Sequence, residues 1–206
     1  DWYFVRQELL LDKNEYLPYH QADNNVIVQT VTSGPDSDWA SIQQSYFTLI
    51  NMAKRYVFIS TPYFMPGETT LNSLKTAAMS GVDVRLLLPH KSDSWLTHWC
   101  TRSYVEELLE AGVKIYEYQP GFLHAKSFVS DDEIGVVGTI NLDYRSLYLH
   151  FEDGVWIYRN RVIQDIKDDF IQTMEYCRQI EPEFCLNRNI GLRIMQNIFR
   201  AFAPLM

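Results

Sequence analysis

The sequence predicts an α/β layered sandwich in which a mixed, mostly parallel sheet carries helices on both faces. Apolar, β-branched segments alternate with segments of about ten to twenty residues that have the three- and four-residue apolar spacing of helices. Between residues 122 and 158, by contrast, three strand-like segments follow one another without a helix of ordinary length. Because this fold class hosts many chemistries, the function has to be argued from particular residues.

The first half of the chain shows the alternation most clearly. A strand is expected at 24–31 (NNVIVQTV), followed by a turn in which Asp38 is a candidate helix N-cap. The helix after it is indicated by apolar residues at helical spacing, namely Trp39, Ile42, Tyr46, Leu49, Ile50 and Ala53. The remaining strands are expected at 56–64, 82–89 and 113–119, with helices at 69–80 and 92–110 that end before Gly81 and Gly112.

The second half departs from this regular alternation. Strands are expected at 122–130, 134–140 and 152–158, and a helix at 161–180. The final segment, 189–206, has apolar residues at every fourth position, namely Ile194, Ile198 and Phe202. This spacing predicts a helix with an apolar stripe. Packing of the stripe on the core is the simpler interpretation, and a position in a membrane interface is the alternative.

Composition disfavours several classes of function. The formal net charge is −8 and the pI is near 5.1, which argues against a nucleic-acid partner. The three cysteines form no C-x-x-C pair, so neither a disulfide framework nor a zinc site is indicated. No apolar run approaches the roughly 18 to 20 residues that span a bilayer. The sequence begins with Asp1 rather than Met, and its first twenty residues are typical of an internal segment. We therefore expect it to be part of a longer protein.

The polar residues of the segment 122–152 carry the strongest functional signal. His124 and Lys126 are two positions apart, so a strand would place both side chains on one face. Alone, this pair is more typical of a hydrogen-bonded core histidine and a surface lysine than of a functional site. The polar and glycine positions that follow at defined spacing are Asp131, Gly138, Thr139 and Asn141, and then Glu152 on the next predicted strand.

The pattern H-x-K-x4-D-x6-G-[ST]-x-N resembles the HKD signature of the phospholipase D superfamily. The segments STPYFMP, GVDVRLLLP, NLDYRS and FEDGVWIY look like those of the C-terminal half of bacterial cardiolipin synthases, and the resemblance covers nearly all of the chain. It implies a phospholipase D-like fold. The chain departs from the family at His150, two residues before the glutamate, where relatives carry Asn.

The resemblance implies a covalent phosphohistidine mechanism that needs no metal or other cofactor. His124 would be the nucleophile or the general acid for the leaving alkoxide. Lys126 would hold a phosphate oxygen, and Asn141 would donate its amide to the same oxygens as charge develops in the transition state.

The remaining motif residues are expected to support this chemistry. Glu152 would orient His124 by accepting from one ring nitrogen, and Thr139 would steady that carboxylate. Asp131 is grouped with the catalytic residues by the motif, but it follows the predicted strand, and a structural role in the turn is expected. Outside the motif, the adjacent His90 and Lys91 would point to opposite faces of a strand, and His98 with Cys100 lacks a second ligand pair for zinc.

The leading hypothesis is the second catalytic half of a cardiolipin synthase, which transfers a phosphatidyl group between two phosphatidylglycerol molecules to give cardiolipin and glycerol. The mechanism needs two histidines, and this chain has one HKD motif. The second would come from a missing N-terminal HKD half or from a second copy in a homodimer. The alternatives are a homodimeric single-motif hydrolase or nuclease and a non-catalytic, lipid-binding half.

The same resemblance suggests a division of the chain. Residues 1–20 would be the tail of a preceding phospholipase D-like half, 21–188 the domain with the HKD motif, and 189–206 a C-terminal amphipathic helix. The expected partners are phosphatidylglycerol, the membrane surface and the other HKD half, with no nucleic acid. The expected location is the cytoplasmic side of a bacterial inner membrane, as a peripheral domain of a membrane-anchored protein. The acceptor alcohol, the identity of the nucleophilic histidine and the activity of the chain alone are left open.

Overall fold

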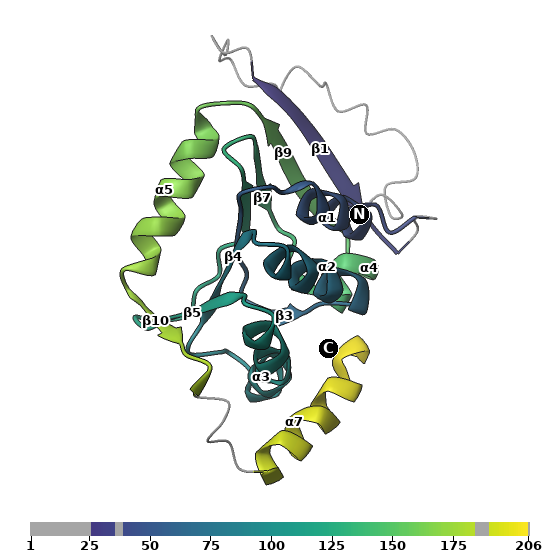
Figure 1. The fold of residues 1–206 in the computed structure, drawn as a ribbon. Coiled ribbons are helices and arrows are strands. Elements are labelled where there is room, and N and C mark those ends of the chain that lie inside the picture. The colour runs from purple at the N-terminus through teal and green to yellow at the C-terminus, as the bar shows by residue number, and fades with distance from the viewer. Residues whose placement is uncertain (1–25, 36–38, 184–189, 206) are drawn as a thin grey trace.

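A computed structural model describes residues 26–35, 39–183 and 190–205 (Figure 1). Its main feature is an eight-stranded sheet. The strands are β1 (Ile27–Ser33), β2 (Tyr56–Ser60), β4 (Asp83–Pro89), β5 (Lys114–Tyr118), β6 (Ser127–Ser130), β7 (Ile134–Gly138), β9 (Glu152–Tyr158) and β10 (Cys177–Ile180). Their order across the sheet is β1-β9-β7-β6-β2-β4-β5-β10. A separate two-stranded sheet joins β3 (Phe64–Met65) to β8 (Leu142–Asp143).

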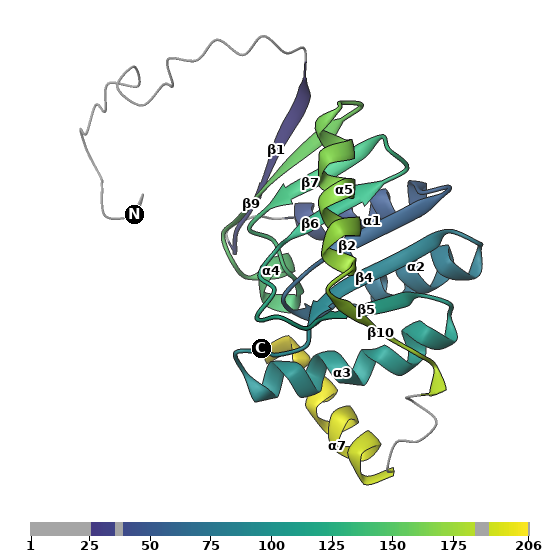
Figure 2. The same cartoon turned by 90° about the vertical axis from the view of Figure 1, so that its left-hand side faces the viewer.

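Helices lie on both faces of the large sheet, as the sequence predicts. The helices are α1 (Ser41–Met52), α2 (Glu68–Met79), α3 (Trp95–Glu110), α4 (Tyr144–Tyr148), α5 (Val162–Met174) and α7 (Ile190–Ala201), with a short 3₁₀ helix, η2, at Ala203–Leu205. In Figure 1 the sheet is seen with α5 on one side and α1, α2 and α3 on the other. Figure 2 shows α5 crossing the face of the sheet, with β1 at one edge and β10 toward the other.

The sheet is mixed, but the expectation that it is mostly parallel is wrong. Parallel pairing joins only β2 to β4 and β4 to β5 among the described strands of this sheet, and the other five neighbouring pairs are antiparallel. The reason is the change of pattern after residue 122. Strands β6, β7 and β9 follow one another without a crossover helix, and short connections can join only antiparallel neighbours.

Two apolar cores stabilise the two faces. The larger one joins α1, α2 and α3 to the sheet and contains Tyr46, Leu86 and Phe128, each 3% exposed or less. The smaller one lies under α5, where Phe170 stacks on Phe58 of β2 at a ring-centroid distance of 5.1 Å. Burial of such aromatic side chains on both faces makes the strands between them a rigid support.

Two predicted elements have different boundaries in the structure. The strand expected at 122–130 begins only at Ser127, which pairs with Ser60 of β2 and Val137 of β7. Residues 122–126 are extended but form no strand pairing. The helix expected at 161–180 ends at Met174, and its last part is instead strand β10 on the edge of the sheet. Asp38 and the proposed domain boundaries at residues 20 and 188 lie outside the described residues.

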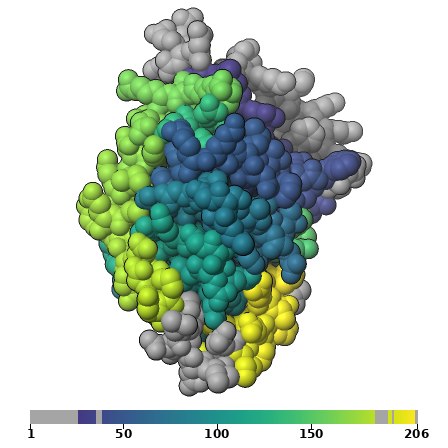
Figure 3. All heavy atoms as spheres, in the orientation of Figure 1, coloured from purple at the N-terminus to yellow at the C-terminus, as the bar shows by residue number. Residues whose placement is uncertain are grey.

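Helix α7 packs on α3, but the apolar stripe is not the surface that makes this contact. The ring of Phe199 meets Trp95 at 5.6 Å, and the guanidinium of Arg200 lies 4.4 Å from the ring of Tyr104 and pairs with Glu107. The stripe residues are 50% to 57% exposed, namely Ile194, Ile198 and Phe202. Figure 3 shows α7 on the surface beside α3. No helix in the described residues is long and apolar enough to cross a membrane.

Candidate active site

His124 and Lys126 lie in the extended segment that leads into β6. Because β6 runs antiparallel to β2, this segment lies at the edge of the sheet where β2 ends. The Lys126 Nζ atom is 3.1 Å from His124 Nε2 and also donates to the His124 carbonyl oxygen at 2.9 Å. The two side chains therefore come together as the sequence predicts, although they precede the strand rather than belong to it.

The contact between these two residues has a consequence for the protonation of His124. An ammonium group can only donate, so a hydrogen bond from Lys126 leaves Nε2 as the acceptor and places the proton of a neutral imidazole on Nδ1. Partial burial lowers the pKa of Lys126, and the nearby carboxylates of Glu152 and Asp143 oppose this effect. The two acidic groups therefore support the charge of the lysine beside His124.

Thr139 and Glu152 meet where β7 ends and β9 begins. The Thr139 hydroxyl donates to Glu152 Oε2 and itself accepts from the backbone N–H of Asp153 at 3.0 Å. A close approach of the two strands makes this possible, since a Cβ on Gly138 would lie 2.3 Å from the Asp153 carbonyl oxygen. Glycine is therefore required at position 138, and the predicted support of the carboxylate by Thr139 is present.

A second hydroxyl, which the sequence analysis did not select, supports the same carboxylate. Ser146, in the first turn of α4, is fully buried and donates to Glu152 Oε1 at 3.0 Å. Its oxygen accepts from Asn141 Nδ2 at 3.1 Å. The residue belongs to the segment NLDYRS, which carries part of the family resemblance, but its role depends on a tertiary contact that spacing does not reveal.

Asp143 fixes the position of this serine. Its carboxylate caps α4 by accepting from the Ser146 backbone N–H at 2.7 Å, while the β3–β8 pair holds its backbone. Burial raises the pKa of Asp143, and hydrogen bonding from Ser146 and Asn141 opposes the rise. The amide of Asn141 is therefore turned toward two acceptors, Ser146 and Asp143.

The contacts of Glu152 do not include His124. Its two oxygens accept from Thr139 and Ser146, and His150 Nδ1 lies 3.7 Å from Oε1. No hydrogen bond between Glu152 and His124 is found in the described residues, and the predicted orienting role stays a prediction. His150, where the chain departs from the family pattern, is about half exposed and lies beside the Glu152 carboxylate.

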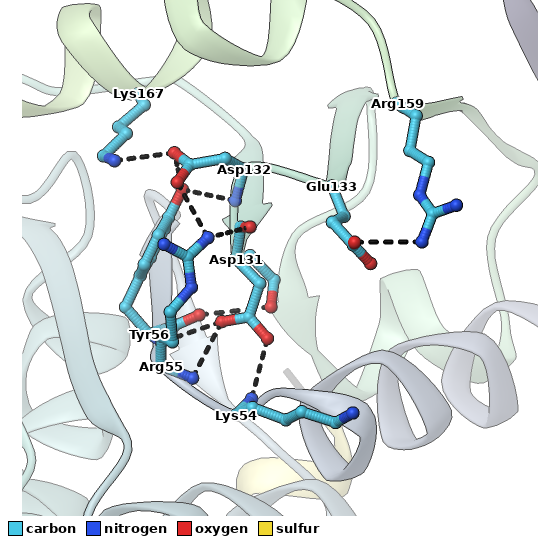
Figure 4. Close-up of polar contacts among 9 residues, drawn as sticks. Lys54, Arg55, Tyr56, Asp131, Asp132, Glu133, Arg159 and Lys167 are labelled. Atoms are coloured by element: carbon cyan, nitrogen blue, oxygen red, sulfur yellow. Dashed lines mark hydrogen bonds and ion pairs between the residues drawn. The ribbon is translucent and has the colours of Figure 1, made fainter.

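Asp131 lies at the other end of β6 from His124, and its contacts are structural. Its carboxylate accepts from the backbone N–H groups of Lys54 at 2.7 Å and of Arg55 and Tyr56 at 2.9 Å (Figure 4). At about 3.3 Å per residue, the four residues of β6 separate it from the histidine segment by more than 10 Å. Partial burial favours a higher pKa for Asp131, but the three backbone hydrogen bonds outweigh burial and lower it.

Asp132 extends this turn into an ion-pair network. Lys167 Nζ lies 2.6 Å from one carboxylate oxygen, and Arg55 Nη2 lies 2.8 Å from the other (Figure 4). The Tyr56 hydroxyl also donates to Asp132, at 2.8 Å. The hydrogen bond from Lys167 is the main reason that the pKa of Asp132 falls to about 2.

The histidines that the sequence analysis set aside belong to a different cluster. His90 Nδ1 lies 3.3 Å from the buried carboxylate of Glu117, which also pairs with Arg102 and Arg178. His98 is on α3 near the same group, and burial lowers its pKa. The described residues contain no group of three or more His, Cys, Asp or Glu side chains arranged to hold a metal ion.

Comparisons with known proteins agree with this geometry. The family model described as "Cardiolipin synthase, PLD-like domain" matches residues 46–174. The chain is 41% identical to a cardiolipin synthase of Geobacillus kaustophilus (strain HTA426), a match covering 100% of this chain and 41% of that protein. It is 42% identical to a cardiolipin synthase of Clostridium perfringens (strain SM101 / Type A), covering 100% and 44%. The chain thus spans about two fifths of the length of these relatives.

Solved structures show the same fold at low identity. Nuc from Salmonella typhimurium, a phospholipase D family member, aligns with a TM-score of 0.66 and 15% identity over 76% of this chain and 99% of that chain. A phosphatidylserine synthase of Haemophilus influenzae Rd KW20 aligns with a TM-score of 0.64 and 15% identity, over 87% and 46%. The sequence matches and the shared fold lead to one conclusion, that this chain belongs to the cardiolipin synthase family of phospholipase D-like domains.

Proposed function

We propose that this chain is one catalytic half of a cardiolipin synthase, which transfers a phosphatidyl group from one phosphatidylglycerol to a second and releases glycerol. The observation that carries the proposal is the pairing of His124 with Lys126 beside the supported carboxylate of Glu152. This constellation stands in a chain that matches cardiolipin synthases over its whole length.

The first step forms a phosphohistidine. An imidazole nitrogen attacks the phosphorus of phosphatidylglycerol, the P–N bond forms, and the P–O bond to the glycerol headgroup breaks. The departing glycerol alkoxide takes a proton from a second histidine that acts as a general acid. In the second step that histidine removes the proton of a headgroup hydroxyl on another phosphatidylglycerol, whose oxygen then replaces the histidine at phosphorus to give cardiolipin.

The side chains of this half fit defined roles in both steps. Lys126 would neutralise a non-bridging phosphate oxygen as charge builds in the transition state. Donation from Asn141 to the phosphate, as expected from the motif, requires an N–H that is not committed to Ser146 or Asp143. Lys126 is therefore the principal electrostatic group in the proposed mechanism, and the role of Asn141 is to be tested by substitution.

A second HKD motif completes the proposed site. The two histidines must stand on opposite sides of the phosphorus, so the site forms between this half and another. The greater length of the matching cardiolipin synthases has room for such a half, and we propose it as the partner. The alternative is a second copy of this chain acting as a hydrolase or nuclease. The match to Nuc covers 99% of that chain, so a single domain of this fold can make up a whole chain, whereas the net charge of −8 disfavours a DNA substrate.

The membrane surface is the proposed second partner, with the domain peripheral to the cytoplasmic side of a bacterial membrane. The lipid substrates have to be drawn from a bilayer. Helix α7 and the residue that follows it offer an exposed stripe of Ile194, Ile198 and Phe202, a side-chain pattern typical of interfacial helices.

The proposal is tested with the full-length protein, phosphatidylglycerol vesicles and mass spectrometry of the lipid products. Wild type and a His90→Ala control should make cardiolipin, and His124→Ala should make none. Release of glycerol with phosphatidic acid as the lipid product would support the hydrolase. Unchanged turnover in His124→Ala would support a non-catalytic half, and absence of cardiolipin with the wild-type protein would refute the proposed function.

A further inference from the structure

Ser146 occupies a central position in the site that the HKD motif does not assign. The residue is fully buried, and its three polar contacts all lead to side chains of the site. Its backbone N–H donates to Asp143, its hydroxyl donates to Glu152, and its oxygen accepts from Asn141. No solvent contact competes with these bonds.

The direction of the hydrogen bonds follows from the number of available protons. A serine hydroxyl has one proton, and a carboxylate can only accept, so the Ser146 proton must point to Glu152. The lone pairs of the hydroxyl are left to receive an N–H from Asn141. The directions of these two hydrogen bonds therefore require that the Nδ2 end of the Asn141 amide, and not the Oδ1 end, faces Ser146.

The rest of the Asn141 side chain agrees with this orientation. Its amide nitrogen also lies near the acceptor Asp143, whereas its oxygen Oδ1 is buried without a hydrogen-bond partner in the described part of the chain. If the Asn141 amide were turned by 180°, Oδ1 would face two other acceptors. These are the carboxylate of Asp143 and the hydroxyl oxygen of Ser146, which already donates its proton to Glu152. Ser146 therefore selects one of the two amide orientations.

We infer that Ser146 is a positioning residue that ties the amide of Asn141 to the carboxylate of Glu152 and sets both for phosphodiester turnover. The inference rests on the proposed function for its catalytic consequence. Without the hydroxyl, Glu152 Oε1 is left with His150 at 3.7 Å, and the Asn141 amide loses one of its two acceptors, Ser146, and keeps Asp143. Each side chain then has one hydrogen-bond partner fewer, and its position in the site is less well defined.

A matched control is available on α2. Ser73 is also buried, its oxygen accepts from Asn51 Nδ2 at the same distance of 3.1 Å, and its hydroxyl donates to the Thr69 carbonyl oxygen. It makes no contact with the site residues named above. Ser73→Ala thus removes an equivalent buried hydroxyl without touching Asn141 or Glu152.

The kinetic test compares Ser146→Ala with Ser73→Ala in the full-length protein, by glycerol release from phosphatidylglycerol whatever the lipid product. Ser146→Ala should lower kcat about 10- to 100-fold and change KM less than about 3-fold, because it acts on the reacting groups. Ser73→Ala should keep kcat. In a double variant, Ser146→Ala with Asn141→Ala, the loss of kcat should be smaller than the product of the two single losses, because part of the effect of Ser146 acts through Asn141. Wild-type kcat in Ser146→Ala, or additive losses in the double variant, would overturn the inference.

A second measurement is independent of activity, so that failure of the proposed function can be told apart from failure of this inference. With ¹⁵N-labelled asparagine, the side-chain amide protons of Asn141 should exchange slowly with water in the wild type and at least about 10-fold faster in Ser146→Ala. The amide of Asn51 should respond only to Ser73→Ala. Equal exchange of the Asn141 protons in wild type and Ser146→Ala would refute the geometry itself.

Discussion

The carboxylate of Asp131 accepts a 2.9 Å hydrogen bond from the backbone N–H of Tyr56, and this contact ties the turn after β6 to the first residue of β2. The aspartate of the motif thus links the neighbouring strands β6 and β2. It lies at the end of β6 opposite to the histidine segment, so we expect it to hold the fold rather than to take part in the reaction.

Asp131→Ala should therefore reduce stability rather than chemistry. Loss of three backbone hydrogen bonds should lower the free energy of unfolding by about 2 kcal/mol, measured by urea denaturation. The kcat of the folded fraction should stay within about 3-fold of wild type. Glu133→Ala, which breaks only the exposed pair with Arg159, is the control and should cost less than about 0.5 kcal/mol. A loss of kcat equal to that of His124→Ala, with unchanged stability, would assign Asp131 to the chemistry instead.

Asp132 should make the stability depend on acid pH. Its pKa in the folded protein is about 2, below the unfolded value of about 3.9, so its contribution is fully present above pH 4 and is lost as the pH falls toward 2. Asp132→Asn should abolish this part of the acid dependence while leaving other carboxylates to titrate. Thermal unfolding of both proteins at several pH values between 2 and 5 checks it. Parallel profiles for the two proteins over that range would contradict the depressed pKa.

Thr139 should act through its hydroxyl on Glu152. Thr139→Val keeps the shape but removes the donor to the carboxylate, and kcat should fall about 10- to 100-fold. Thr139→Ser keeps the donor and should retain most of the activity. The measurement is steady-state turnover of phosphatidylglycerol by the full-length protein. If the valine and serine variants lost activity equally, the side-chain packing or strand geometry at this position would be responsible rather than the hydrogen bond.

The sequence predicts much of this site because neighbouring strands bring the motif together. His124 precedes β6, Thr139 follows β7 and Glu152 begins β9. These three strands are adjacent in the sheet, so linear order and spatial order agree. Ser146 was missed for the opposite reason. It lies in a five-residue helix held in place by the Asp143 cap and the β3–β8 pair, contacts that no local periodicity encodes.

The sequence predicts the direction of the strands only in part. Alternating strands and helices correctly predict the parallel group β2, β4 and β5, since a crossover helix returns the chain in the same direction. The pairing of β1 with β9 at the far edge joins residues more than a hundred positions apart. Local patterning contains no signal for such a long-range choice, which is why the proportion of antiparallel pairs was underestimated.

Gly138 should tolerate no side chain. In Gly138→Ala the new Cβ would meet the Asp153 carbonyl oxygen at 2.3 Å, a backbone atom that cannot move without separating β7 from β9. We expect a loss of about 2 to 4 kcal/mol in the free energy of unfolding, together with loss of activity, because Thr139 and Glu152 depend on the same approach. Gly121→Ala is the control, since nothing lies within 4 Å of its added Cβ. Equal urea midpoints for the two variants would show that the strands separate without cost.

The exposed stripe of α7 should determine how strongly the 206-residue chain binds phosphatidylglycerol vesicles. Replacing Ile194, Ile198 and Phe202 with Asn removes three apolar side chains from the proposed membrane contact, and each should contribute about 1 kcal/mol or more to partitioning. Binding measured by vesicle sedimentation should fall at least about 10-fold, with circular dichroism and thermal unfolding showing that the fold is kept. Met52→Asn with Met79→Asn, which changes two exposed residues on α1 and α2, should bind like wild type. Equal sedimentation of the stripe variant and wild type would mean that this helix face does not contact lipid. The site would then have to reach its substrates through another surface.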